Sequence, residues 1–329
     1  MMPDACAVRP RLSVQLARYR FHWLVTTPLG LPDYAGSTLR GVFGRALRDL
    51  VCVMRAPECS NCRLVARCFY AAFFEPQRAA SLQPRGHNPV PAVSGYAIEP
   101  STATRRWYKP GDSFEFDMVV MLHQALSQLP LIIEAWQRAF AAGVGERNGR
   151  ARLQRVEHLA PASARSVVYQ TGLNKLLPHD TEVCVPEFDR SLDVHLSLLT
   201  PLRLEQRDRL VGPRELTPPV FFRHLIRRVS FHVNGRHGEV FSLEAIHRLN
   251  ALADGVGEGA RDLRWVDWTR FSSRQKQKMT LGGVIGTWLL TAVHPDLLSL
   301  LYLGEWLHVG KECVFGLGRY RWSPASATN

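Results

Sequence analysis

The sequence predicts an α+β fold made of two tandem βαββαβ units. In the first half, alternating apolar residues predict strands at 12–25, 93–99, 113–122 and 150–158, and amphipathic patterns predict helices at 37–51 and 130–142. The second half repeats this order, with strands at 192–204, 268–273, 279–285 and 316–322, helices at 218–229 and 295–307, and an additional helix at 242–252. This is the order of the ferredoxin-like, or RRM-like, unit, in which helices cover one face of the sheet and the other face is free for a ligand.

The domain boundary is expected between residues 172 and 191. We therefore expect an N-terminal ferredoxin-like domain at 1–185 and a C-terminal ferredoxin-like domain with a glycine-rich loop at 186–329. A cysteine-rich insertion at about 52–75 follows the first helix of the first domain.

The first strand changes its apolar phase along its length. Leu12, Val14 and Leu16 share one face, and the apolar set then moves to Tyr19, Phe21, Trp23 and Val25, which predicts a bulge near Ala17. The residues opposite the aromatic side chains are Arg18, Arg20 and His22. They indicate either a basic strip or an ordinary polar outer face.

Asp33 or Ser37 is positioned to cap the helix at 37–51. One side of this helix is apolar, and the other carries Arg40, Gly41, Gly44, Arg45 and Arg48. Each interior glycine costs about 1 kcal/mol relative to alanine, so two of them among arginines require a reason. That reason is the close approach of a phosphate backbone or tight packing against another segment.

The charge of the chain favours a polyanionic partner. The 329 residues include 41 basic and 29 acidic side chains, a net charge of +12, and only five of the basic residues are lysine. Arginine suits phosphates and bases, although a solvated surface encoded by a GC-rich genome is the alternative explanation. The longest weakly polar run, 281–293, has 13 residues, whereas a membrane span needs about 20, and the first residues do not resemble a secretory signal. We therefore expect a cytoplasmic protein that does not contact a membrane.

Four of the seven cysteines form a C-x6-C-x2-C-x5-C pattern. They are Cys52, Cys59, Cys62 and Cys68. The short central spacing suits two thiolates on one metal, so the pattern indicates a structural zinc site, with an iron–sulfur cluster or metal-free thiols as alternatives. Seven cysteines in a cytoplasmic protein argue against a disulfide framework.

A glycine-rich segment lies near the C-terminus, at 308–320. It contains His308, Lys311, Gly316, Gly318 and Arg319, so its glycines can expose backbone N–H groups to phosphate while the cations neutralise it. The sequence lacks the GxxxxGK[ST], HExxH and GxSxG motifs, which removes the commonest signatures of nucleotide hydrolysis, metalloproteolysis and ester hydrolysis.

Three passages together resemble one family. They are residues 36–45, residues 271–286 with Arg274, and residues 308–320, and they resemble the CRISPR precursor-RNA processing endoribonucleases of the RAMP superfamily. The resemblance implies binding of repeat hairpins and cleavage without a metal cofactor, in which the 2′-hydroxyl attacks the adjacent phosphate and leaves a 2′,3′-cyclic phosphate. The product would be mature guide RNA, and other subunits of a CRISPR effector complex are possible partners.

The resemblance also directs the choice of site residues. Family members often place a catalytic histidine in or near the first helix of domain one, whereas this chain has none between His22 and His87. The catalytic candidates are His308, Lys311, Tyr34 and His22, and a site of arginine and lysine alone is the rival. The RNA-binding candidates are Arg18, Arg20, Arg40, Arg45, Arg48, Arg274, Gly316, Gly318 and Arg319.

Two other functions stay open at this stage. A non-catalytic RAMP-type subunit that holds CRISPR RNA would share the same folds and glycine-rich loop. A zinc-containing nucleic-acid-binding regulator would explain the cysteines, but it lacks a recognition helix of its own.

Overall fold

The computed structural model describes residues 12–56, 58–59, 61–76, 95–101, 106–161, 164–173, 175–237, 240–272 and 277–325. The chain divides into two compact units, Gln15–Val183 and Met1–Val14 with Cys184–Asn329. Their boundary lies near the one proposed from the sequence, and the segment through Val14 groups with the C-terminal unit. Within the described residues, no helix is both long and apolar enough to cross a membrane.

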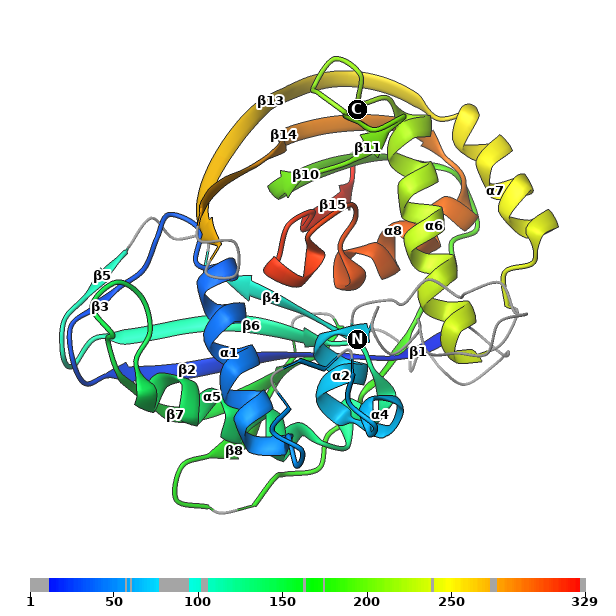
Figure 1. Cartoon of the computed structure of the whole chain (residues 1–329). Coiled ribbons are helices and arrows are strands. Elements are labelled where there is room, and N and C mark those ends of the chain that lie inside the picture. Colours follow the sequence, from blue (N-terminus) through cyan, green and yellow to red (C-terminus); the bar gives the residue numbers. More distant parts are fainter. Residues whose placement is uncertain are drawn as a thin grey trace. The chain divides into compact units, whose positions relative to one another are not determined.

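The N-terminal unit contains a five-stranded antiparallel sheet in the order β4-β6-β2-β7-β8 (Figure 1). These strands are β2 (Ala17–Val25), β4 (Tyr96–Pro100), β6 (Ser113–Val120), β7 (Ala151–Leu159) and β8 (Arg165–Gln170). The helices are α1 (Gly36–Val51), α4 (His123–Leu126) and α5 (Leu129–Ala142). Without β8 this is the ferredoxin-like order, as expected, because α1 and α5 connect the strands as in two split βαβ units.

Aromatic residues fill the core between this sheet and its helices. Trp23 of β2 stacks on Phe140 of α5 with ring centroids 4.1 Å apart, and Phe43 of α1 stacks on Trp136 of α5 at 4.6 Å. The alternation in β2 therefore directs the aromatic side chains toward the helices and the polar ones to the opposite face.

The phase shift in the first strand is a break and not a bulge. β1 (Ser13–Gln15) is separate from β2 and pairs with β9 (Glu182–Cys184). The backbone N–H of Leu16, between the two strands, donates to Thr181 at 2.9 Å. The expected bulge near Ala17 is therefore wrong, because the chain changes its pairing partner at this point.

The cysteine-rich insertion folds back on α1. It contains the 3₁₀ turn η1 (Val65–Arg67) and α2 (Phe69–Phe74). A separate two-stranded ladder pairs β3 (Leu29–Gly30) with β5 (Trp107–Tyr108), away from α2, at the left of Figure 1.

The C-terminal unit contains a four-stranded sheet in the order β13-β14-β10-β15, which is also the ferredoxin-like order. Its strands are β10 (Leu192–Leu202), β13 (Gly257–Ser272), β14 (Gln277–Val293) and β15 (Tyr320–Pro324), and its helices are α6 (Pro218–His237), α7 (Leu243–Asp254) and α8 (Pro295–Leu307). The short elements β11 (Glu205–Gln206), β12 (Arg209–Leu210) and η3 (Cys313–Phe315) lie in its loops. Phe221 packs edge-on against Trp288 and Tyr320, with centroids 6.4 and 5.7 Å away.

Strands β13 and β14 are much longer than the sequence predicted. The first part of β13, from Gly257, is rich in glycine and charge and does not alternate clearly. Because β13 lies at the sheet edge, its polar residues reach solvent, and Arg261 places its guanidinium 5.4 Å from the ring of Trp288. The last strand begins at Tyr320 and not at Gly316, since the glycines form a turn before it.

Candidate functional site

The basic residues of β2 are paired with carboxylates. Arg18 is 3% exposed and places its Nε 3.1 Å from Oε2 of Glu99 on β4, which is also buried. Arg20 donates from Nε to Asp117 on β6 at 2.7 Å, and this hydrogen bond holds the pKa of its guanidinium above the ordinary value. These ion pairs favour a neutralised polar face over a basic strip for Arg18 and Arg20.

His22 belongs to the same network of ion pairs. Its Nδ1 lies 3.3 Å from Oε2 of Glu115, and its Nε2 lies 2.9 Å from Oε2 of Glu157. Two carboxylates from β6 and β7 therefore hold the imidazole on both sides, an arrangement that orients the ring.

Helix α1 resolves the question of its two glycines. A Cβ on Gly44 would collide with the ring of Phe74 from α2, whereas a Cβ on Gly41 would meet nothing within 4 Å. Tight packing therefore explains Gly44. The backbone at Gly41 is open to the approach of a ligand.

The arginines of α1 have different environments. Arg40 places its guanidinium 4.3 Å from the ring of Phe74 and donates to the Tyr96 hydroxyl at 3.1 Å. Arg48 donates to the carbonyl oxygen of Ala56 in the cysteine-rich insertion. Arg45 is exposed, so its side chain is the accessible one of the three.

The first turn of α1 is suited to an anion. Ala35 is the N-cap, without a side-chain cap hydrogen bond, and the turn contains no acidic residue. The expected caps are therefore wrong: Asp33 instead pairs with Arg106. Tyr34 is half-buried beside this turn, where uncapped backbone N–H groups and the helix dipole favour negative charge.

The glycine-rich segment is packed into the C-terminal unit. Gly316 and Gly318 are buried with φ of +87° and +68°, and a Cβ on Gly318 would collide with the carbonyl oxygen of Val309. Backbone N–H groups at 308, 309, 311, 315, 316, 318 and 319 already donate to acceptors within this unit. The expectation that the two glycines contact RNA is therefore at odds with the structure, which uses them to close the turn before β15.

His308 lies inside this turn. It is fully buried, has φ of 58° at the end of α8, and its Nδ1 lies 3.1 Å from the carbonyl oxygen of Leu317. A proton on Nδ1 is required for that contact, which ties the start of the segment to its end. The buried position favours a positioning role over direct contact with substrate.

The cations of the segment reach the surface. The side chain of Lys311 is 55% exposed and pairs with Glu205 of β11. Arg319 is half-buried, and its backbone N–H donates to the Thr200 hydroxyl at 2.9 Å. Arg274 lies outside the described residues.

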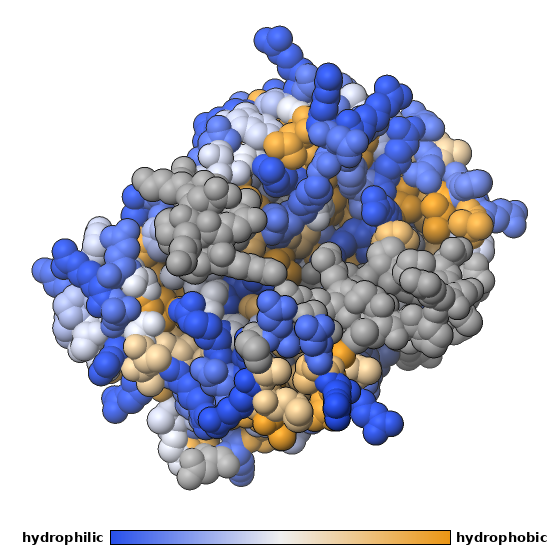
Figure 2. Space-filling view, viewed as in Figure 1, coloured by the Kyte–Doolittle hydropathy of each residue, from blue (hydrophilic) through white to orange (hydrophobic). Residues whose placement is uncertain are grey.

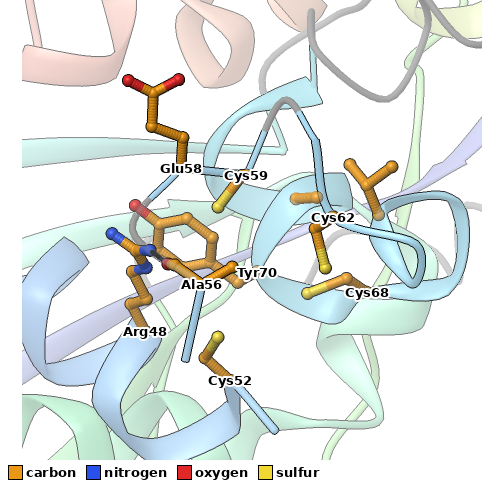
Figure 3. Close-up of a pocket in the computed structure, with 10 residues that line it drawn as sticks. Arg48, Cys52, Ala56, Glu58, Cys59, Cys62, Cys68 and Tyr70 are labelled. Atoms are coloured by element: carbon orange, nitrogen blue, oxygen red, sulfur yellow. Dashed lines mark hydrogen bonds between the residues drawn. The ribbon is translucent and has the colours of Figure 1, made fainter. Parts of the chain in front are cut away.

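All four cysteines of the insertion line one pocket, together with Arg48 and Tyr70. Figure 3 shows their thiol groups around this pocket, with those of Cys62 and Cys68 turned toward each other. Within the described ranges, no three His, Cys, Asp or Glu residues are arranged closely enough to hold a metal ion. The four predicted cysteine ligands therefore line one pocket, but their sulfur atoms are not at coordinating positions around a common point. Cys184 is disulfide-bonded.

A cluster of titratable residues that the sequence analysis did not predict lies near the start of β2. The Tyr19 hydroxyl lies 2.8 Å from Nε2 of His179, whose ring is 5.1 Å from that of His158. Both histidines line a pocket with Asp180 and Glu182. Burial, and then the nearby His179, lowers the pKa of His158 to about 4. The register of β2 and β7 places Tyr19 beside His158, and His179 joins them through its contact with the Tyr19 hydroxyl. Neither contact has a direct signal in the sequence.

Two family models match the chain, and each match falls largely within one of the two compact units. Residues 12–181 match the model of the AF_1859 N-terminal domain, and residues 196–320 match the model of the CRISPR-associated endoribonuclease Cas6. The C-terminal part of the chain is a Cas6-family domain by this match. The resemblance of the sequence to the CRISPR RNA-processing endoribonucleases is thereby confirmed. The Cas6 match includes the whole segment from His308 to Tyr320.

Solved structures support the same fold. A Cas6 product complex has 13% sequence identity and a TM-score of 0.56, and the match covers 94% of this chain and 99% of that one. Thermus thermophilus Cas6 has 14% identity and a TM-score of 0.50, with 95% and 99% covered. At these identities the likeness concerns the fold alone.

Another solved structure is a larger assembly. A partial Cas6-RT-Cas1–Cas2 complex has 13% identity and a TM-score of 0.57, and the match covers 97% of this chain. This chain spans 47% of the length of that chain. No curated protein matches the sequence.

Proposed function

We propose that this protein is an endoribonuclease that cuts CRISPR precursor RNA at its repeat hairpins and releases mature guide RNA. The observation that carries this proposal is the match of residues 196–320 to the Cas6 endoribonuclease model, on a unit with the ferredoxin-like strand order. The net charge of +12 supports a nucleic-acid substrate. We also propose subunits of a CRISPR effector complex as partners, and we propose no membrane contact.

The proposed reaction needs no metal ion. The 2′-oxygen attacks the adjacent phosphorus as a base takes its proton, the bond from phosphorus to the 5′-oxygen breaks, and that oxygen receives a proton. The products are a 2′,3′-cyclic phosphate and a 5′-hydroxyl. Catalysis then depends on proton transfer and on cations around the pentacoordinate phosphorus.

The accessible candidates for these roles lie in both units. In the N-terminal unit, Tyr34 lies beside the uncapped first turn of α1, with the exposed Arg45 further along that helix. In the C-terminal unit, Lys311 and Arg319 supply positive charge, and His308 holds the segment that carries them. Within the N-terminal unit we assign proton transfer to Tyr34. Within the C-terminal unit we assign RNA phosphate binding to Lys311 and Arg319, and positioning of the segment to His308.

A second candidate function has support from the histidines. His308 is buried and His22 is held between two carboxylates, so neither imidazole is open to an RNA hydroxyl in this structure. This favours, as the alternative, a non-catalytic subunit that holds CRISPR RNA.

We also propose that the cysteine pocket binds one structural zinc ion. Four thiols suit zinc, and four thiolates leave no open position for catalysis. The guanidinium of Arg48 beside the pocket would offset part of the negative charge of a tetrathiolate site. The four cysteine side chains would have to move closer together to bind the ion, because they are not arranged as metal ligands in this structure.

Incubation of the purified protein with the repeat RNA of its own locus, in EDTA, tests the function. Cleavage that leaves a 2′,3′-cyclic phosphate supports the endoribonuclease, and tight binding of intact RNA supports the holding subunit. Cleavage that requires added metal in a protein that stays folded in EDTA contradicts the proposed mechanism.

A further inference from the structure

An exposed tryptophan lies at the β3–β5 end of the N-terminal unit. Trp107 is 53% exposed, although it lies in a strand that pairs with β3. Its six-membered ring lies on Gly30, where an added Cβ would collide with it. The glycine therefore seats one part of the indole while the rest stays open to solvent.

The backbone below the indole is held closely in place. Gly145, with φ of +75°, packs against the carbonyl of Gly30, and Gly149 packs against Leu29 so closely that a Cβ would lie 2.5 Å from its Cα. The N–H of Leu31 donates to the carbonyl of Arg106 at 2.9 Å. Three chain segments thus form a rigid support, which reduces the entropy lost when a ligand stacks on the ring.

The surroundings of Trp107 are rich in cations. The guanidinium of Arg147 lies 4.9 Å from the ring centroid. The exposed cations of this end are Arg106, Lys109, Arg147, Arg150 and Arg152, against the acids Asp33, Asp112 and Glu146. Figure 2 shows mainly hydrophilic residues over β3 and β5, at the left of the view. An aromatic face among arginines is the combination that binds single-stranded nucleic acid.

We propose that Trp107 is a stacking platform for one unpaired base of RNA. The base would take the place of the Arg147 guanidinium, which lies over the ring, and Arg147 would then bind the flanking phosphate. This inference rests on the proposed function for its substrate class. The platform adjoins the start of α1, because Arg106, next to Trp107, pairs with Asp33, next to Tyr34. A nucleotide beside the hairpin stem is thereby held near the anion-binding first turn of α1.

Two variants separate stacking from packing. Trp107→Leu keeps an apolar group on Gly30 without an aromatic face, whereas Trp107→Phe keeps a smaller aromatic face. The probes are the repeat RNA and a fluorescent octa-adenylate that has no hairpin. Trp107→Leu should bind both about five- to a hundredfold more weakly, and Trp107→Phe should recover most of the loss. Arg147→Gln should weaken binding and lower its salt dependence, with Arg138→Gln on α5 as the matched control.

Cross-linking of a 4-thiouridine octamer to the wild-type protein makes the test independent of variant folding. A cross-link mapped by mass spectrometry to the peptide with Trp107 supports the platform, and cross-links confined to other peptides overturn it. Wild-type affinity in a folded Trp107→Leu variant also overturns it, even where the repeat RNA is cut. Loss of octa-adenylate binding in Trp107→Leu, in a protein that cuts no repeat RNA, supports the platform while the endoribonuclease proposal fails.

Discussion

Two histidines of the N-terminal unit lie in opposite electrostatic environments. His22 has a carboxylate on each side, whereas His158 is 6% exposed and lies beside His179. Burial, and then the neighbouring His179, opposes a proton on the ring of His158. The environment of His158 therefore makes the stability of the unit depend on pH.

We expect the free energy of unfolding to fall as the pH drops below about 6.5. The pKa of His158 is about 4 in the folded protein, against roughly 6.5 in the unfolded chain, so between these values only the unfolded chain takes up the proton. The contribution of the neutral His158 ring to stability is complete above about pH 6.5 and is lost toward pH 4. At pH 5 the loss is on the order of 1–2 kcal/mol. Urea unfolding at pH 7 and pH 5 measures the difference.

The variant His158→Gln removes this titration and should flatten the pH dependence, whatever its effect on stability at pH 7. His123→Gln, at an exposed position on α4, is the matched control and should leave the dependence unchanged. An equal loss of stability between pH 7 and pH 5 in wild type and His158→Gln would assign the effect to other groups.

Asparagine at position 308 separates positioning from catalysis. Asparagine tolerates a positive φ and can donate an N–H to the Leu317 carbonyl, so His308→Asn should keep the turn and stay within about tenfold of the wild-type cleavage rate. His308→Ala loses the hydrogen bond and should lower both thermal stability and rate. Single-turnover cleavage at saturating protein measures the rate without the influence of binding. A well-folded His308→Asn that is slower by about 10²- to 10⁴-fold would instead make the imidazole a direct acid or base.

At the scale of elements, Arg45 is the exposed arginine of α1 and the one proposed to contact RNA. Arg45→Ala should weaken binding of repeat RNA and reduce the slope of log K against log salt by about one, because one phosphate contact is lost. Arg138→Ala, on α5, is also exposed and serves as the control. Unchanged affinity and slope in Arg45→Ala would remove α1 from the RNA-binding surface. Arg40→Ala is the less informative variant, since it also loses packing on Phe74.

The cysteine-rich insertion should contain about one zinc ion per chain. Metal analysis of protein purified without chelator should find it, and Cys59→Ser with Cys62→Ser should lose it together with thermal stability, because metal binding is linked to folding of the segment. Cys313→Ser, at a buried cysteine outside the pocket, should retain the metal. Protein without zinc in a wild-type preparation would leave the four thiols as metal-free structural groups.

The elements that the sequence predicts best are those with one buried face. The amphipathic pattern of α5 places this helix close to its observed range. The apolar alternation of β2 gives the observed end of the strand at Val25, although the residues before Ala17 form the separate strand β1. Pattern alone fails at the sheet edge, where the charged start of β13 is solvated, and at position 308, where a polar residue is buried by a turn. It also fails for the carboxylates of β6 and β7 that neutralise β2, because their register with β2 is a tertiary property.

At the scale of the whole molecule, the two units share one strand order but differ in where their cations lie. In the N-terminal unit the arginines of the central strand are neutralised, and accessible positive charge remains on α1 and at the β3–β5 end. In the C-terminal unit exposed Lys311 follows α8, next to the turn that precedes β15. The net charge alone predicts affinity for RNA, and the fold determines which cations are available.

The distribution of charge and aromatic groups predicts recognition of hairpin shape over stem sequence. A-form RNA has a deep, narrow major groove that side chains do not read, so the stem offers mainly its phosphates and its 2′-hydroxyls. A repeat hairpin whose stem base pairs are exchanged in complementary fashion should bind within a fewfold of the natural hairpin, whereas an unpaired RNA of equal length should bind much more weakly. Raising the salt from 50 to 200 mM should weaken binding of both hairpins in parallel, by about 10³-fold if six phosphates are contacted. Fluorescence anisotropy across a salt titration gives all of these constants. Loss of binding on exchange of the stem pairs, with the salt slope unchanged, would show that base edges of the stem are read and would contradict recognition by shape.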